Sequence, residues 1–124
     1  MLRYVLGRFL FFGVLGWAVE NIVEPPSEGG LHWSPWVPRY TPWIPAYALA
    51  GVMLGELAPV LRALPLPARA GVYAVGSTAF ELLACHVDRA LGGHTWDYGK
   101  GLGVDAKHTA MWTAAALVVE PFLR

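Results

Sequence analysis

The sequence predicts an all-α protein, a four-helix bundle embedded in a membrane, from its apolar composition and from four long apolar stretches that each carry a glutamate. Of 124 residues, 56% are hydrophobic and 15% are charged. Soluble domains have about 45–50% apolar and about 25% charged residues. Because a small soluble domain needs a large polar surface, we expect lipid to surround this chain. The length fits one domain, residues 1–124.

Charge and cysteine content exclude other classes of protein. Nine basic and nine acidic residues give a formal net charge of zero, so no basic field for nucleic acid is expected. The single cysteine, Cys85, excludes an intramolecular disulfide and a zinc site with several cysteines. The chain contains no GxSxG, Walker, HExxH or Rossmann glycine motif. We therefore expect no cofactor.

The first helix is predicted at about 4–23. Its roughly 20 residues can cross about 30 Å of hydrocarbon if Arg8 extends to the membrane surface. A basic start and the small residues Gly16 and Ala18 also fit a cleavable signal peptide. Glu20, directly after the apolar core, favours the membrane helix.

Three further helices are predicted at about 44–64, 70–89 and 108–123. The connection 24–45 contains six prolines and three tryptophans, so it should lie as an irregular loop at the membrane interface, or as a lid over a pocket. Small residues in 70–89 suit close contact between helices in lipid.

Four spans place both termini on one side of the membrane. The short turn 64–67 would lie on that same side, flanked by Arg62 and Arg69. Positively charged short loops are typical of the cytoplasmic side. We therefore expect cytoplasmic termini.

One glutamate lies in or near each apolar stretch. An ionisable group in the bilayer costs at least about 2.5–3.5 kcal/mol on insertion scales, so four of them suggest a role. Along the chain, the first and third glutamates are separated by nearly the same number of residues as the second and fourth. This suggests two helical hairpins related by a pseudo-twofold axis along the membrane normal. The four residues are Glu20, Glu56, Glu81 and Glu120.

Simpler interpretations of these glutamates exist. Glu20 and Glu120, near the ends of their spans, could reach water at the headgroups. Glu56 and Glu81 lie deeper and could serve only to hydrogen-bond a neighbouring helix. On the third helix, Glu81 shares one face with Cys85 and Asp88 at i, i+4, i+7 spacing.

Metal binding has weak support. His86 and His94 are the candidates, but the Glu-x-x-His pairs of carboxylate di-metal bundles are missing. We therefore assign no metal site. The candidate binding residues are the glutamates and nearby aromatic or polar residues: Glu20, Glu56, Glu81, Glu120, Trp17, Tyr47, Trp96, Asp97, Tyr98 and Trp112.

Several short motifs follow one another along nearly the whole chain: Gly16-Trp17 with Glu20, Pro45-Ala46-Tyr47-Ala48, Phe80-Glu81, Trp96-Asp97-Tyr98-Gly99, and Trp112 with Glu120. In this order they resemble a widespread family of small bacterial membrane proteins labelled type IV ABC transporter. That family is similar to vertebrate four-span transmembrane proteins of unassigned function. The resemblance implies a four-helix bundle in a bacterial inner membrane. Gly99 and Ala48 depart from its usual serine and glycine.

Three functions fit these observations. The first is a transport-associated or assembly subunit, as part of a larger membrane complex or a homo-oligomer. The second is an oligomeric, proton-coupled permease for small solutes, with Glu56 and Glu81 titrating. The third is a membrane-embedded enzyme for a lipid or isoprenoid, with Glu81 and Asp97 as acid and base, because a desolvated carboxyl group has a raised pKa.

Overall fold

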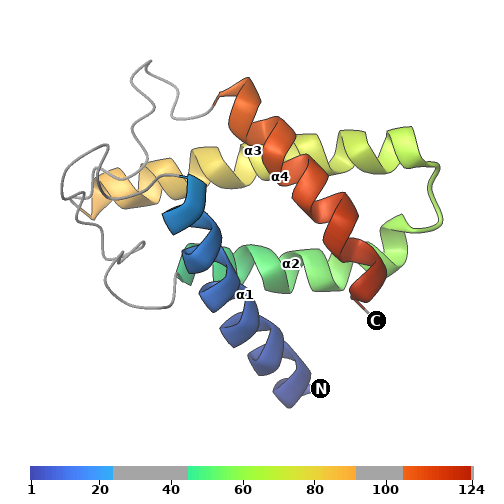
Figure 1. Ribbon diagram of the computed structural model, residues 1–124, viewed down its shortest axis with the longest axis horizontal. Helices are drawn as coiled ribbons and strands as arrows, with labels where there is room; N and C mark the ends of the chain where they lie inside the picture. The colour runs from blue at the N-terminus through green and yellow to red at the C-terminus, as the bar shows by residue number, and fades with distance from the viewer. Residues whose placement is uncertain (24–44, 92–104, 124) are drawn as a thin grey trace.

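The computed structural model describes residues 1–23, 45–91 and 105–123, and of residues 20–23 it describes the backbone alone. These residues form four α-helices and a 3-10 turn, with no strand among them, so the expected all-α class is confirmed. The elements are α1 (Leu2–Val23), α2 (Pro45–Leu61), α3 (Leu66–Ala90), α4 (Ala106–Val119) and η1 (Glu120–Phe122) (Figure 1).

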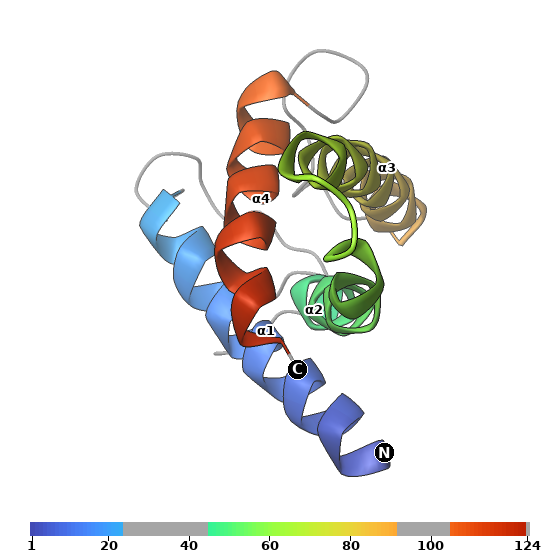
Figure 2. The ribbon, with the colours of Figure 1, turned by 90° about the vertical axis from the view of Figure 1, so that its right-hand side faces the viewer.

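The helices lie in two layers. Helices α2 and α3 form one layer, and α1 and α4 cross obliquely over them in the other (Figures 1 and 2). The most extensive contacts join α1 to α2 and α3 to α4. The described chain therefore folds as two pairs of helices that are consecutive in the sequence. Both termini lie on the same side of the ribbon.

A face of small residues on α2 lets α1 approach closely. Ala48, Gly51, Gly55 and Ala58 are buried and follow one another at steps of three and four, which places them on one face of the helix. A Cβ atom at Gly51 would lie 2.0 Å from the ring of Phe12. Because the glycine has no side chain, the ring of Phe12 can pack directly on the backbone of α2, as in helix pairs packed in lipid.

The contact is reciprocal at the other end of the interface. There the glycine is on α1, and a Cβ atom at Gly16 would lie 2.0 Å from the ring of Tyr47 on α2. The C-terminus closes the opposite end, where Phe12, Ala58 and Leu123 form a buried cluster. These two ends fix the register of α1 on α2.

Prolines set two helix boundaries. Helix α3 begins at Leu66, four residues before the expected position, because Pro65 is extended (φ −63°, ψ 151°) and Pro67 stands in the first turn, where no N–H is needed. Near the C-terminus, Pro121 lacks the N–H that would continue the α-helix. The chain therefore tightens into η1 from Glu120 onward.

Helix lengths bear on the membrane interpretation. Helices α1 (22 residues) and α3 (25 residues) are long and apolar enough to cross a membrane. Helix α2 is apolar but has 17 residues, and α4 has 14. A perpendicular span takes about 20 residues. The structure thus contains two candidate membrane-spanning helices among the described residues.

Candidate functional site

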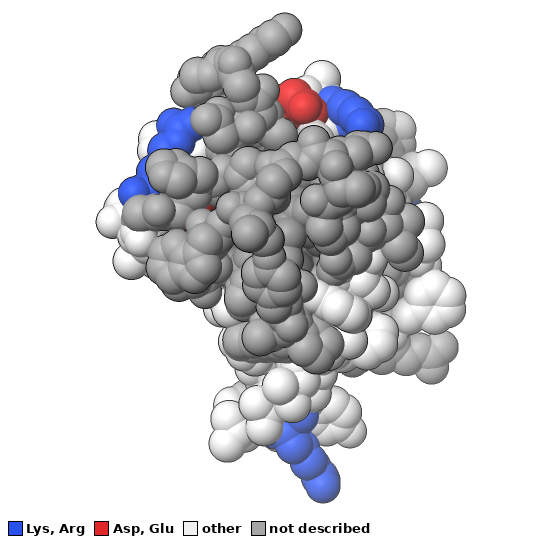
Figure 3. Space-filling model, turned by 60° about the vertical axis from the view of Figure 1, so that its left-hand side comes forward, with Lys and Arg blue, Asp and Glu red and all other residues white. Residues whose placement is uncertain are grey.

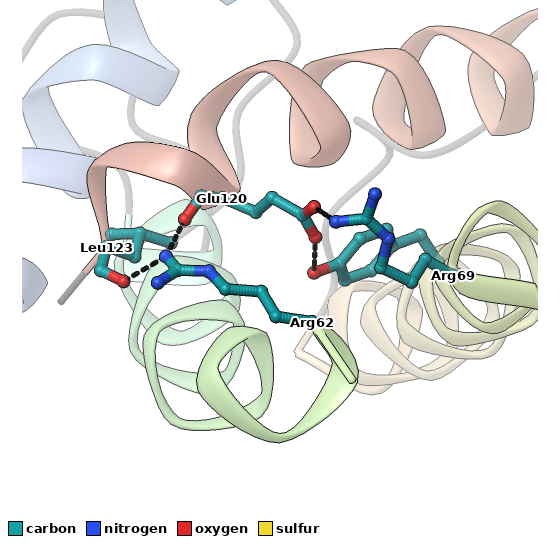
Figure 4. A network of polar contacts seen from close by, with 5 residues as sticks. Arg62, Arg69, Glu120 and Leu123 are labelled. Carbon is teal, nitrogen blue, oxygen red and sulfur yellow. Dashed lines mark hydrogen bonds and ion pairs between the residues drawn. The ribbon is translucent and has the colours of Figure 1, made fainter. Parts of the chain in front are cut away.

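The best-defined polar site in the described chain is centred on Glu120, the first residue of η1. Its side chain is only 3% exposed. Arg69 Nη1 donates to Oε1, and the hydroxyl of Tyr73 donates to Oε2 at 2.6 Å (Figure 4). Arg69 and Tyr73 are four residues apart and therefore share one face of α3. Both carboxylate oxygens accept from the same helix.

A second arginine holds the backbone of the same turn. Arg62, in the turn after α2, donates through Nη2 to the carbonyl oxygens of Glu120 and Leu123 (Figure 4). The last carbonyls of a helix lack intrahelical donors, and an arginine near that end satisfies them. We call Arg62, Arg69, Tyr73 and Glu120 the Glu120 cluster. It connects the α2–α3 turn, helix α3 and the C-terminal turn.

The chemistry of the Glu120 cluster is that of an anchor. The guanidinium group of Arg69 and the hydroxyl of Tyr73 donate to one carboxylate, and charge-assisted contacts of this type are stronger than neutral hydrogen bonds. A buried carboxylate is tolerated because its partner is present, and removal of either partner is costly. Since donors already occupy both oxygens of Glu120, the arrangement favours holding helices together over accepting a proton from a substrate.

Glu56 has a different environment from the one expected. It lies on the outer side of α2 with its side chain 64% exposed, and its Oε1 is 3.0 Å from Nη1 of Arg8 on α1. Arg8 therefore reaches across to the neighbouring helix, over Gly55, whose missing side chain leaves room for it. This ion pair joins α1 to α2.

Glu81, Cys85 and Asp88 lie together inside the protein. They are 4%, 1% and 0% exposed, and their spacing places them on one face of α3, as the sequence predicts. Cys85 packs with Ala46 and Ala84 in a buried cluster. The third helix thus directs two acidic side chains to the protein interior.

Three predicted aromatic binding residues meet beside that face. Trp17 and Tyr47 pack against the cluster that contains Cys85. The ring of Tyr47 also contacts that of Trp112, with centroids 5.0 Å apart and planes tilted by 46°. Side chains from α1, α2 and α4 therefore converge next to α3. Their role here is packing at the helix junction.

Several predicted site residues lie outside the described residues. They are His94, Trp96, Asp97 and Tyr98, in the connection 92–104, and the side chain of Glu20. His86 is described and is exposed on α3. Among the described residues no group of three or more histidine, cysteine, aspartate or glutamate side chains could hold a metal ion.

Sequence reasoning selected Glu120 but missed its partners. In the sequence, Arg62 and Arg69 served only to predict which side of the membrane a turn faces. Tyr73 was not among the candidate site residues. The i, i+4 spacing of Arg69 and Tyr73 is the one signal that would have paired them. Nothing in the sequence joins that pair to a residue some fifty positions later.

Comparison with family models, with curated proteins and with solved structures finds no match to this chain.

Proposed function

We propose that this chain is an integral membrane protein of the bacterial inner membrane, with four membrane-crossing helices and cytoplasmic termini, that works as a transport-associated or assembly subunit. One observation carries the proposal. The described helices turn large apolar side chains outward, whereas Glu81, Asp88 and Glu120 are buried, the reverse of the usual distribution in a soluble protein. An exposed apolar surface and a buried charge are the informative departures from ordinary burial.

The outward apolar residues occur on every helix. Among them Phe11 is 60% exposed, Val60 71%, Val75 72% and Val118 67%. The buried charged residues of the described chain are Glu81, Asp88 and Glu120. On the face shown in Figure 3, Lys and Arg side chains lie at its upper and lower edges, and described uncharged residues lie along its right-hand side. Exposed apolar side chains on all four helices suit contact with the hydrocarbon of a bilayer.

Close packing favours a subunit over a self-contained permease. Within the α1–α2 interface, ring atoms fill the space over Gly16 and Gly51, and Arg8 fills the space over Gly55. Glu56, a candidate for proton coupling, lies on the outside of this pair and is bound to Arg8. A solute pathway along these helices would need a second copy or a partner. We therefore propose that any solute pathway forms only in an oligomer of this chain or in a complex with a partner.

Membrane extraction followed by mass determination tests the proposal. We expect the expressed chain to stay in the membrane pellet after alkaline carbonate washing and to require detergent for release. In mild detergent, light scattering should give a protein mass well above the 13.5 kDa of one chain. Release by carbonate would contradict membrane insertion. A stable lone protomer, at all protein concentrations and with no partner retained, would contradict the subunit role.

A further inference from the structure

An open groove runs between α1 and the C-terminal turn, apart from the Glu120 cluster. Its volume is about 500 Å³. Tyr4, Gly7, Phe11 and Leu15 line it along α1, and Phe122 lines it from the other side. The tyrosine and both phenylalanines are more than half exposed. The groove is therefore a lengthwise apolar channel at the surface, bounded by protein on two sides.

The length of the groove suits one leaflet of a bilayer. Its lining on α1 extends from Arg3 to Leu15, and at 1.5 Å per residue this is roughly 18 Å. Half of the hydrocarbon core is about 15 Å thick. A single acyl chain lying along α1 would therefore be covered from the interface to near the middle of the membrane.

One end of the groove is positively charged. Arg3 and Arg8 both line it. Arg8 is paired with Glu56, whereas Arg3 is exposed and makes no ion pair with any described residue. One positive charge remains in excess at the end of an apolar channel. Guanidinium groups bind phosphate through two parallel hydrogen bonds and are favoured for that role.

We propose that this groove binds an anionic phospholipid, with an acyl chain against Phe11 and Leu15 and the phosphate-bearing headgroup at Arg3. Charge complementarity and the match in length select this occupant. The proposal goes beyond the subunit function and needs only that the chain lie in a membrane.

Gly7 provides a way to close the groove without disturbing the fold. A Cβ atom added there meets no other atom within 4 Å, so Gly7→Leu would extend into the groove. Gly76 on α3 is equally open and does not line the groove. Gly76→Leu is therefore a matched control with the same change in side chain and in helix propensity.

Native mass spectrometry of the detergent-solubilised protein tests the proposal. The protein is titrated with phosphatidylglycerol or phosphatidylcholine of identical acyl chains. We expect tighter binding of phosphatidylglycerol, and we expect Arg3→Gln to reduce that preference by about fivefold, the usual effect of one basic residue near an anionic membrane surface. Gly7→Leu should weaken both lipids by roughly tenfold, equivalent to losing contact with about two methylene groups. Gly76→Leu should bind as the unaltered protein does.

Other outcomes would overturn the proposal. Equal affinity for the two lipids, or equal effects of Gly7→Leu and Gly76→Leu, would show that the groove does not select an anionic lipid. Displacement by millimolar inorganic phosphate would show a free-anion site instead. A change in oligomeric mass with Gly7→Leu, without a change in lipid binding, would show that a second copy occupies the groove. Carbonate extraction separates these results from a failure of membrane insertion itself.

Discussion

At the scale of single residues, the carboxylate of Glu120 is almost fully buried and accepts hydrogen bonds from two side chains. The sequence marks it as an acid at the end of an apolar stretch, which fits either a headgroup contact or an internal one. The structure places it inside, against Arg69 and Tyr73. Residues that far apart in the sequence meet only through the packing of α4 on α3.

Glu120→Ala should destabilise the protein by roughly 3 kcal/mol, because it leaves Arg69 partly buried without its counter-charge. Tyr73→Phe removes one hydrogen bond and keeps the ion pair, so it should cost about 1.5–3 kcal/mol at most. Thermal unfolding in detergent, followed by circular dichroism, measures both. A Glu120→Ala variant as stable as the unaltered protein would show that the Glu120 cluster is not an anchor.

Asp105 is the N-cap of α4 and lies outside the apolar spans. Its Oδ1 accepts from the backbone N–H of His108 at 2.7 Å and lies 2.9 Å from Nδ1 of the same residue. The backbone N–H, followed by the side chain of His108, lowers the pKa of Asp105 below its ordinary value of 3.8. The ionised form is the one that caps the helix.

The pH dependence of α4 follows from this lowered pKa. The stabilisation is fully present above pH 3.8 and is lost as the pH falls through the lowered pKa, because protonation then removes the favoured acceptor. Asp105→Ala should cost about 1 kcal/mol at neutral pH and abolish this acid-dependent loss. Asp105→Asn keeps a cap without a charge, so it should remove the pH dependence alone. Melting temperatures of the unaltered protein and both variants, measured above and well below pH 3.8, test this prediction. Equal acid sensitivity of the three proteins would show that ionised Asp105 does not stabilise α4.

At the scale of elements, the small-residue face of α2 determines how α1 packs. The sequence shows Gly51 and Gly55 four apart, a spacing common in membrane helix contacts, but it does not say which helix lies against them. The sequence instead predicts close helix contacts for the small residues of 70–89. In the structure Gly71 and Gly76 face open space, whereas the glycines of α2 face Phe12 and Arg8.

Gly51→Ala should therefore destabilise the α1–α2 pair by about 1–3 kcal/mol, the usual cost of overfilling a close contact. The added methyl group would lie 2.0 Å from the ring of Phe12. Gly76→Ala is the control and should be neutral or stabilising by up to about 1 kcal/mol, through helix propensity. Unfolding in detergent compares the two. Equal effects would mean that the contact tolerates a methyl group.

Helix boundaries were partly accessible from the sequence. Proline at 65 and 121 and aspartate at 105 are local signals, and each coincides with a boundary in the structure. The third helix begins at Leu66 rather than at the expected residue 70, because Pro67 lies within its first turn. In the first turn of a helix proline removes no hydrogen bond.

At the scale of the whole molecule, apolar side chains are exposed on all four helices, as the proposed membrane setting predicts. Leu10 tests this directly, since it lies near the middle of α1 with 51% of its surface exposed and does not line the groove. In a membrane helix a central arginine costs about 2.5–3.5 kcal/mol. On the surface of a soluble protein an exposed substitution changes stability by about 0.5 kcal/mol or less.

Leu10→Arg should therefore reduce the fraction of protein retained in carbonate-washed membranes, whereas Leu10→Ala should leave it nearly unchanged. Quantitative immunoblotting of pellet and supernatant measures the fractions. Retention of Leu10→Arg at the level of the unaltered protein would indicate that this face of α1 does not contact lipid.

The sequence by itself determined the helical class, the number of apolar stretches and the presence of an acid in each, because composition and periodicity are local properties of the chain. Tertiary structure alone decided what those acids do. Glu56 pairs with Arg8 on the outside, Glu81 turns inward beside Cys85, and Glu120 is held by Arg69 and Tyr73. The partner of a charged side chain depends on which helix packs against it, and that choice follows from the shapes of whole faces rather than from any short segment.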